Sequence, residues 1–167
     1  MKVLDVIQKR RSIRKFKTDM EISQEQIDLI LEAAMMAPSA NNARPWEFIV
    51  VRDRDRICDI SSIHPDISIA KEASLIIVIC GLPIAGEESE LYFPQDCAVA
   101  TQNLLLQATE LGLGSCWCGI YPQDEKVLGL SDVLGLVNIP FNVITIGVPD
   151  ENPSARGFYE ESKVRYM

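Results

Sequence analysis

The sequence contains no long apolar run. Its longest uncharged apolar stretch covers residues 75–84, which is well short of the roughly 20 residues that cross a bilayer. The N-terminal residues MKVLDVIQKRRS also lack the apolar segment of a secretory signal peptide. We therefore expect neither a membrane association nor export, and a cytoplasmic location.

Histidine is nearly absent, because His64 is the single histidine among 167 residues. One imidazole cannot build a histidine-rich metal site, and nothing beside His64 in the sequence would orient it as a catalytic base. The five cysteines are an odd number scattered along the chain, which favours a reducing compartment over a disulfide framework. We predict no metal site.

Positive charge is scarce outside the N-terminus. The chain has a net charge of −8 and a pI near 4.7, yet its first 17 residues hold seven basic side chains against Asp5 alone. Such an acidic protein is a poor general ligand for nucleic acid, because that affinity depends on neutralising many phosphates. The compact basic cluster suggests a small anion as its partner.

Hydrophobic spacing predicts a mixed α and β domain with about four strands and five or six helices. Ser23 and Gln26 have the spacing of a capping box that opens a helix ended by Pro38. The remaining helices are expected over 3–9, 53–62, 94–111 and 124–130, and the strands over 47–51, 75–80, 115–120 and 141–148.

Two of these elements carry extra information. The strand at 75–80 is short and β-branched, so we expect it to be buried on both faces. The helix from Pro94 to Leu111 holds only Asp96 and Glu110 as charges, which is typical of a helix covered on most sides, such as one at an interface. The tail from Pro149 is polar and is expected to be extended.

The basic motif Arg10-Arg11-Ser12-x-Arg14 has the side chains that bind phosphate. Guanidinium groups form bidentate hydrogen bonds to phosphate, and a serine hydroxyl adds another donor. Arg156 in the tail is a further candidate for the same anion. The alternative is a solvated basic face, since runs of charge are commonly exposed.

Two polar loops could contact a heterocycle. Residues 38–45 (PSANNARP) offer amide and hydroxyl groups between prolines, although most such segments only connect a helix to a strand. Residues 112–119 (GLGSCWCG) are not a dinucleotide fingerprint, because Trp117 stands where a third glycine is needed. Cys116 and Cys118 share one face of a strand and are either buried small side chains or a thiol redox pair.

These segments together resemble the nitroreductase family of flavin-dependent oxidoreductases. The matching pieces are RRSIRKF at 10–16, APSANNARPWEF at 37–48, DCAVATQNLLLQATELGLGSCW at 96–117 and IGVP at 146–149. They follow in order over nearly the whole chain. This sequence departs from the family at Arg44, where many relatives have glutamine, and at Ser154, where a second basic residue is common.

The resemblance implies FMN bound at the interface of an intertwined homodimer. The implied fold is α+β, with a mostly antiparallel central sheet flanked by helices. Residues 1–167 would form a single nitroreductase-like FMN-binding domain in which residues 149–167 are a C-terminal arm over the partner. The cofactor-binding residues that it implies are Arg10, Arg11, Ser12, Arg14, Pro38, Ser39, Asn42, Trp117, Cys118, Gly119 and Arg156.

Within that set, the resemblance assigns residues 10–14 and Arg156 to the phosphate and ribityl chain. Residues 38–42 of the partner would contact the isoalloxazine ring, and the backbone of 117–119 would lie near its N5 edge. NAD(P)H would pass a hydride to N5, and a nitroaromatic or quinone would then accept it in a ping-pong cycle, with no catalytic side chain required.

Two other functions stay open at this point. Residues 52–74 leave little chain for a lid, so the protein could be an FMN-binding module or a reductase with a donor other than a nicotinamide. A flavin-free thiol redox protein using Cys116 and Cys118 is the third possibility, and it predicts a colourless protein that loses activity when Cys118 is changed to serine.

Overall fold

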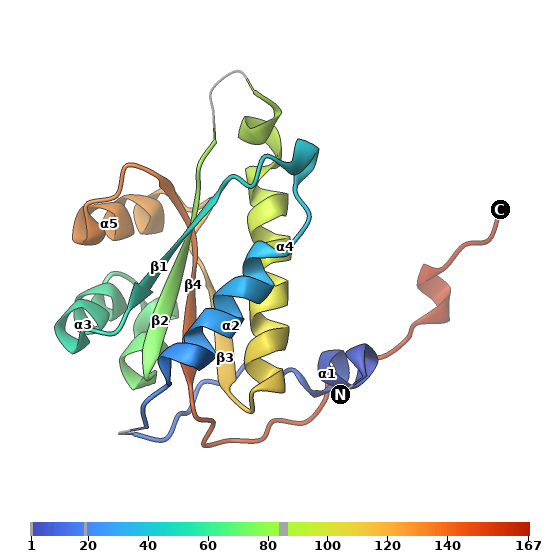
Figure 1. The fold of residues 1–167 in the computed structure, drawn as a ribbon, viewed down its shortest axis with the longest axis horizontal. Coiled ribbons are helices and arrows are strands. Elements are labelled where there is room, and N and C mark those ends of the chain that lie inside the picture. Colours follow the sequence, from blue (N-terminus) through green and yellow to red (C-terminus); the bar gives the residue numbers. More distant parts are fainter. Residues whose placement is uncertain (1, 19, 84–86) are drawn as a thin grey trace.

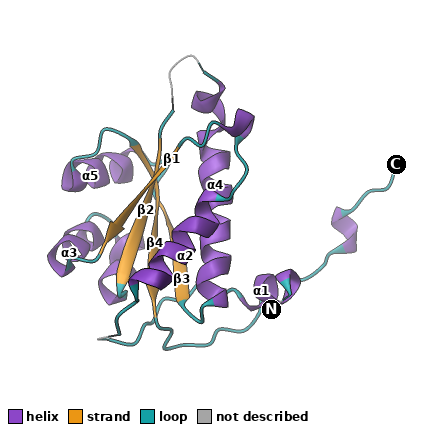
Figure 2. Ribbon diagram, viewed as in Figure 1, coloured by secondary structure: helices purple, strands orange, loops and turns teal. Residues whose placement is uncertain are grey.

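A four-stranded sheet forms the centre of the computed structural model, which describes residues 2–18, 20–83 and 87–167. The strands are β1 (Trp46–Val51), β2 (Leu75–Gly81), β3 (Gly114–Gly119) and β4 (Ile139–Gly147). Their order is β1-β2-β4-β3, and all neighbouring pairs are antiparallel. Helices lie on both faces (Figures 1 and 2), which confirms the predicted α+β architecture.

The central strand β2 contributes side chains to the hydrophobic cores on both faces of the sheet. All seven of its residues are buried, as the β-branched run predicts. Ile77 and Ile79 pack toward α2 (Gln24–Met35) and α4 (Glu88–Glu110). Ile76 and Val78 point the opposite way, into the core beneath α3 (Arg54–Ser62) and α5 (Asp124–Leu134). The alternation of side chains along one strand therefore supplies both cores.

The predicted capping box at the start of α2 is confirmed. The Ser23 hydroxyl oxygen accepts a hydrogen bond from the backbone N–H of Gln26 at 3.2 Å. The Gln26 side-chain oxygen accepts one from the backbone N–H of Ser23 at 3.1 Å. These bonds satisfy donors that the first turn of a helix leaves without partners.

The prediction that Pro94 opens the long helix is wrong. Helix α4 begins at Glu88, and Pro94 lies inside it. A proline inside a helix removes one backbone hydrogen bond, and here the neighbouring buried side chains of Phe93 and Cys97 hold the chain in place. Glu88 and Glu90 also stand in the first turn, where negative charge is favourable.

Other boundaries differ from the prediction in smaller ways. Helix α5 runs to Leu134, beyond the predicted end, and stops at Gly135 with a φ of 64°. A 3-10 helix, η2 (Pro65–Glu72), occupies a stretch with no predicted element. Two further 3-10 turns are η1 (Ala40–Asn42), inside the predicted loop, and η3 (Glu161–Lys163) in the tail. No helix among the described residues is long and apolar enough to span a membrane.

The segment after α1 (Val3–Lys9) runs along the edge of the sheet. The backbone N–H of Ile13 donates to the carbonyl of Ser115 at 2.9 Å, beside β3. Two glycines make this approach possible, because a Cβ on Gly114 would lie 2.8 Å from Ile13 and one on Gly147 would lie 2.7 Å from Phe16. The motif at residues 10–14 is thus held against the sheet.

The C-terminal tail is extended, as predicted. After β4 it passes below the sheet to α1 and then runs away from the rest of the molecule (Figure 1). Its aromatic side chains are largely uncovered, and Phe158 is 80% exposed.

Candidate functional site

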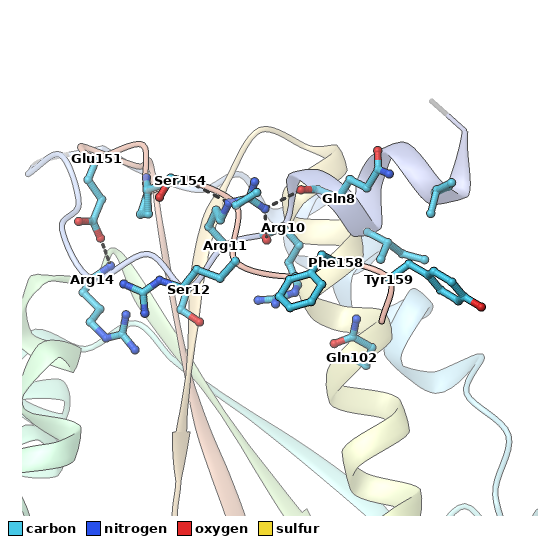
Figure 3. A pocket seen from close by; sticks show the side chains of 16 residues that line it. Gln8, Arg10, Arg11, Ser12, Arg14, Gln102, Glu151, Ser154, Phe158 and Tyr159 are labelled. Carbon is cyan, nitrogen blue, oxygen red and sulfur yellow. Dashed lines mark hydrogen bonds between the residues drawn. The ribbon is translucent and has the colours of Figure 1, made fainter. Parts of the chain in front are cut away.

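A large cavity lies between the end of α1, the middle of α4 and the tail (Figure 3). Its volume is about 1090 Å³, at the upper end of the range for sites that hold small ligands. It joins residues from both ends of the chain. The predicted site residues that line it are Arg10, Arg11, Ser12, Arg14 and Arg156.

The chemistry of the cavity wall suits an anion with an apolar part. Four arginines face one carboxylate, that of Glu151, although the chain as a whole is acidic. The far end adds apolar and aromatic side chains that could pack against a ring or chain of a ligand: Leu4, Ile7, Phe158 and Tyr159. A phosphate with an organic group attached matches this combination.

Arg11 differs from the other arginines of the motif, because its guanidinium is bonded to the main chain. Its Nη1 donates to the carbonyls of Gln8 at 2.6 Å and Arg10 at 2.8 Å. Its Nε donates to the carbonyl of Pro153 in the tail at 3.1 Å. These contacts leave fewer donors for a ligand than Arg10 or Arg14 could offer.

Glu151 was not singled out from the sequence, and it lies at the centre of the contact between the tail and the N-terminal segment. Its Oε1 accepts hydrogen bonds from the backbone N–H groups of Arg14 at 2.5 Å and Lys15 at 3.2 Å. Next to it, the N–H of Asp150 donates to the carbonyl of Lys15 at 2.9 Å. No local pattern links residues so far apart in sequence.

The loop with Pro38, Ser39 and Asn42 is held by bonds within itself. The Ser39 Oγ accepts from the backbone N–H of Arg44 at 2.9 Å, and Asn42 Oδ1 accepts from Arg44 Nε at 3.0 Å. Asn42 and Arg44 have φ values of 55° and 50°, a left-handed conformation that is uncommon without glycine. The loop therefore has a defined shape.

Helix α4 anchors this loop from below. The buried Asp96 accepts a hydrogen bond from the backbone N–H of Ala40 at 3.0 Å through Oδ1. Its second oxygen, Oδ2, is also buried, and within the described part of the chain it has no hydrogen-bond partner. A buried carboxylate fixes the start of η1 in this way.

The strand β3 places Trp117, Cys118 and Gly119 at the edge of the sheet. Trp117 and Gly119 are exposed, and the Trp117 ring meets Phe141 edge-on at 5.8 Å between centroids. Cys118 is buried and packs in the core beneath α3 and α5. The backbone at this edge is therefore accessible, while the thiol is not.

The two cysteines of β3 are buried, as one of the two sequence interpretations proposed. A hydrogen bond with Cys118 is the main cause that lowers the pKa of Cys116 to about 7, and the charge of Arg14 acts in the same direction. That same hydrogen bond, together with burial, raises the pKa of Cys118.

The predicted site residues fall into two groups in a single chain. The basic residues and Arg156 surround the cavity. The others are absent from the described residues that line it: Pro38, Ser39, Asn42, Trp117, Cys118 and Gly119.

The fold and the cavity together define an α+β protein with a cavity lined by four arginines, formed between the two ends of its chain. The profile of the Nitroreductase family matches residues 7–68 and 64–148. A "Putative NADH dehydrogenase/NAD(P)H nitroreductase" of Methanothermobacter thermautotrophicus is 42% identical over 166 residues, which cover 98% of this chain and 86% of that protein. The chain therefore belongs to the nitroreductase family of oxidoreductases.

Solved structures agree with this family assignment. A "Putative NADH Oxidase" from Clostridium acetobutylicum is 36% identical with a TM-score of 0.90, over 96% of this chain and 98% of that one. An "FMN-dependent Nitroreductase" from Clostridium difficile is 33% identical with a TM-score of 0.88, over 98% of both chains. The similarity covers nearly the full length of each.

Proposed function

We propose that the protein is an FMN-dependent oxidoreductase that takes a hydride from NAD(P)H and passes it to a small-molecule acceptor such as a nitroaromatic or a quinone. The observation that carries the proposal is the meeting of Arg10, Ser12, Arg14 and Arg156 around one cavity. The names of the M. thermautotrophicus and C. difficile relatives support the donor and the cofactor.

The residues present fit FMN. The arginines and the Ser12 hydroxyl would hold its phosphate, and the apolar wall near Phe158 offers a surface for less polar parts. The accessible backbone of Trp117 and Gly119 would lie near the reacting edge of the ring. When bound, FMN supplies hydride transfer through N5, so the protein's own residues bind and orient it, and we assign no catalytic side chain.

We further propose that the site is completed in a homodimer. The loop at Pro38–Asn42 is held by hydrogen bonds but lies outside the cavity of its own chain, so the loop of a second copy would contact the ring. Val3 on α1 is 75% exposed, and the tail at 149–167 is an extended arm that could reach a partner. We treat residues 1–167 as a single domain of such a dimer.

A second candidate is an FMN-binding module, or a reductase with a donor other than a nicotinamide. The observation that favours it is the position of residues 52–74. These form α3 and η2, and Ile57, Ile60 and Ile67 within them are fully buried in the core. The segment therefore supports the sheet and does not form a lid over the cavity.

The visible spectrum of the purified protein tests the proposal. We expect the absorbance of bound flavin, and its rapid bleaching when NADH or NADPH is added without oxygen. Bound flavin without bleaching would favour the second candidate. A colourless protein that binds no added FMN would overturn both, and would return the thiol pair to consideration.

The phosphate ligands are tested with Arg10→Ala and Arg14→Ala. Loss of a charge-assisted hydrogen bond should weaken FMN binding by about 10-fold or more in each variant, because such bonds contribute about 1.5–3 kcal/mol. Lys9→Ala is the control, since it removes an exposed positive charge that does not line the cavity. Stoichiometric flavin retained by the double variant Arg10→Ala, Arg14→Ala would contradict the assignment.

A further inference from the structure

We propose that Arg11 and Glu151 act as positioning residues. Together they form a reciprocal clamp that sets the distance between two walls of the cavity, the N-terminal segment at residues 10–15 and the tail at residues 151–160. The proposal rests on the proposed function, because it concerns the affinity of the same site for FMN. In this proposal Arg11 does not contact the phosphate itself but holds the segment that carries Arg10, Ser12 and Arg14.

The clamp consists of two side chains that each bind the main chain of the other segment. Arg11 belongs to the N-terminal segment and donates to the carbonyl of Pro153 in the tail at 3.1 Å. Glu151 belongs to the tail and accepts from the N–H groups of Arg14 and Lys15 at 2.5 and 3.2 Å. Figure 3 shows the contact of Glu151 with Arg14 and the contacts of Arg11. The two segments are therefore joined in both directions.

The position of the clamp matters because neither segment is itself a helix or a strand beyond the backbone bonds of Ile13 to Ser115 and of Asp150 to Lys15. Residues 10–15 follow the end of α1, and residues 151–160 contain no helix or strand. Arg156 lies three residues past Pro153, in a stretch that is exposed. The spacing between Arg156 and the pair of Arg10 and Arg14 therefore depends on where the tail leaves the clamp.

The clamp also explains why the carboxylate of Glu151 lies in a cavity whose other charged side chains are positive. Two successive backbone N–H groups are a ready binding site for an anion. Here the protein's own Glu151 occupies that site, so an incoming phosphate is left to the side chains of Arg10, Ser12 and Arg14. Arg11 in turn has three of its donor contacts committed to carbonyls, which fits a structural guanidinium.

Two conservative substitutions distinguish a positioning effect on FMN binding from an effect of net charge alone. Arg11→Lys keeps the positive charge but loses the planar fork that reaches several carbonyls at once. Glu151→Gln removes the negative charge but keeps an oxygen that can accept from both N–H groups. If the clamp positions the residues that bind the phosphate, Arg11→Lys binds FMN more weakly and Glu151→Gln does not. If charge alone matters, the first binds FMN normally and the second binds it more tightly.

We expect Arg11→Lys and Glu151→Ala to weaken FMN binding by about 10-fold, and Glu151→Gln to stay within about 3-fold of the unchanged protein, by fluorescence titration. Riboflavin, which lacks the phosphate, is titrated in parallel and should show the same affinity in all variants. Normal FMN affinity in Arg11→Lys, or FMN binding tightened 10-fold in Glu151→Gln, would overturn the clamp.

A second measurement needs no flavin. Hydrogen exchange at the amides of Arg14 and Lys15 in the flavin-free protein should be faster in Arg11→Lys and Glu151→Ala, and unchanged in Glu151→Gln and in the control Lys9→Ala. Unchanged exchange in Glu151→Ala would overturn the clamp. If the unchanged protein binds no FMN, the proposed function fails, while the exchange rates still decide whether the clamp exists.

Discussion

At the scale of single residues, the arginines of one motif differ in their contacts. Arg10 and Arg14 line the cavity, whereas the guanidinium of Arg11 is bonded to the carbonyls of Gln8, Arg10 and Pro153. Their chemistry is the same, so the direction of each side chain determines which groups it can contact. Directions in this segment depend on how it packs on the sheet, and Gly147 is one residue that permits this packing.

We predict that Gly147→Ala destabilises the protein by about 1–3 kcal/mol, the usual effect of adding a methyl group to a packed site. The new Cβ would lie 2.7 Å from the ring of the buried Phe16, which cannot move without shifting the segment that carries the arginines. Urea denaturation measures the free energy of unfolding.

The control for this prediction is Gly157→Ala. A Cβ at Gly157 would meet no atom within 4 Å, so its effect should stay within about 0.5 kcal/mol. Equal stability of the two alanine variants would show that Phe16 does not pack against Gly147 as described.

At the scale of elements, one buried lysine joins three of them. Lys126 in α5 is 2% exposed, and its ammonium lies 2.6 Å from the Asp66 carboxylate of η2. The same Nζ lies 3.5 Å from the carbonyl of Gly119 at the end of β3. The hydrogen bond from Lys126 is the main cause that holds the pKa of Asp66 below its ordinary value of 3.8, and His64 has a minor effect in the same direction.

This lowered pKa predicts a dependence of stability on pH. The stabilisation from Asp66 is fully present above pH 3.8 and is lost as the pH falls through the lower pKa of the folded protein. Asp66→Asn should therefore have a Tm several degrees lower at neutral pH, because Lys126 loses its partner. The Tm values of the variant and the unchanged protein should converge toward acid pH.

Thermal unfolding followed by circular dichroism over the acid range tests this expectation. Asp132→Asn, at an exposed position of α5, is the matched control and should track the unchanged protein. A constant difference in Tm between Asp66→Asn and the unchanged protein at every pH would show that the Asp66 charge has no part in it.

At the scale of the whole molecule, the proposed homodimer makes a prediction about the apolar face of α1. Val3 is 75% exposed and borders a groove formed with α2 and α4. A charge in a buried interface is unfavourable unless it is paired. We predict that Val3→Glu raises the dimer dissociation constant by about 10-fold or more, and that bound FMN falls in proportion.

Sedimentation velocity and flavin content measure the two effects. The control is Val137→Glu, which makes the same substitution at a residue that is 98% exposed between α5 and β4. A protein that sediments as a monomer before any change, or a Val3→Glu dimer as tight as the control, would contradict the predicted interface.

The sequence alone was enough for features that arise from neighbouring residues. The β-branched run at 75–80 predicts a strand buried on both sides, and the pair Ser23 and Gln26 predicts a helix start, because propensity and capping are local. The concentration of positive charge at residues 10–14 is equally local, and its interpretation as an anion site stays a prediction. Pro94 shows the limit of local rules, because buried neighbours kept it inside α4.

Tertiary structure alone decided which of these residues meet. Glu151 and the amide of Arg14 are separated by 137 positions, and no spacing rule reaches across such a distance. The meeting of Arg156 with the N-terminal motif likewise depends on the path of the tail along the sheet. The sequence by itself therefore determined most of the helices and strands and the positive charge of residues 10–14. The path of the chain decided that the guanidinium of Arg11 is bonded to the carbonyl of Pro153 in the tail, because this contact forms between the two ends of the chain.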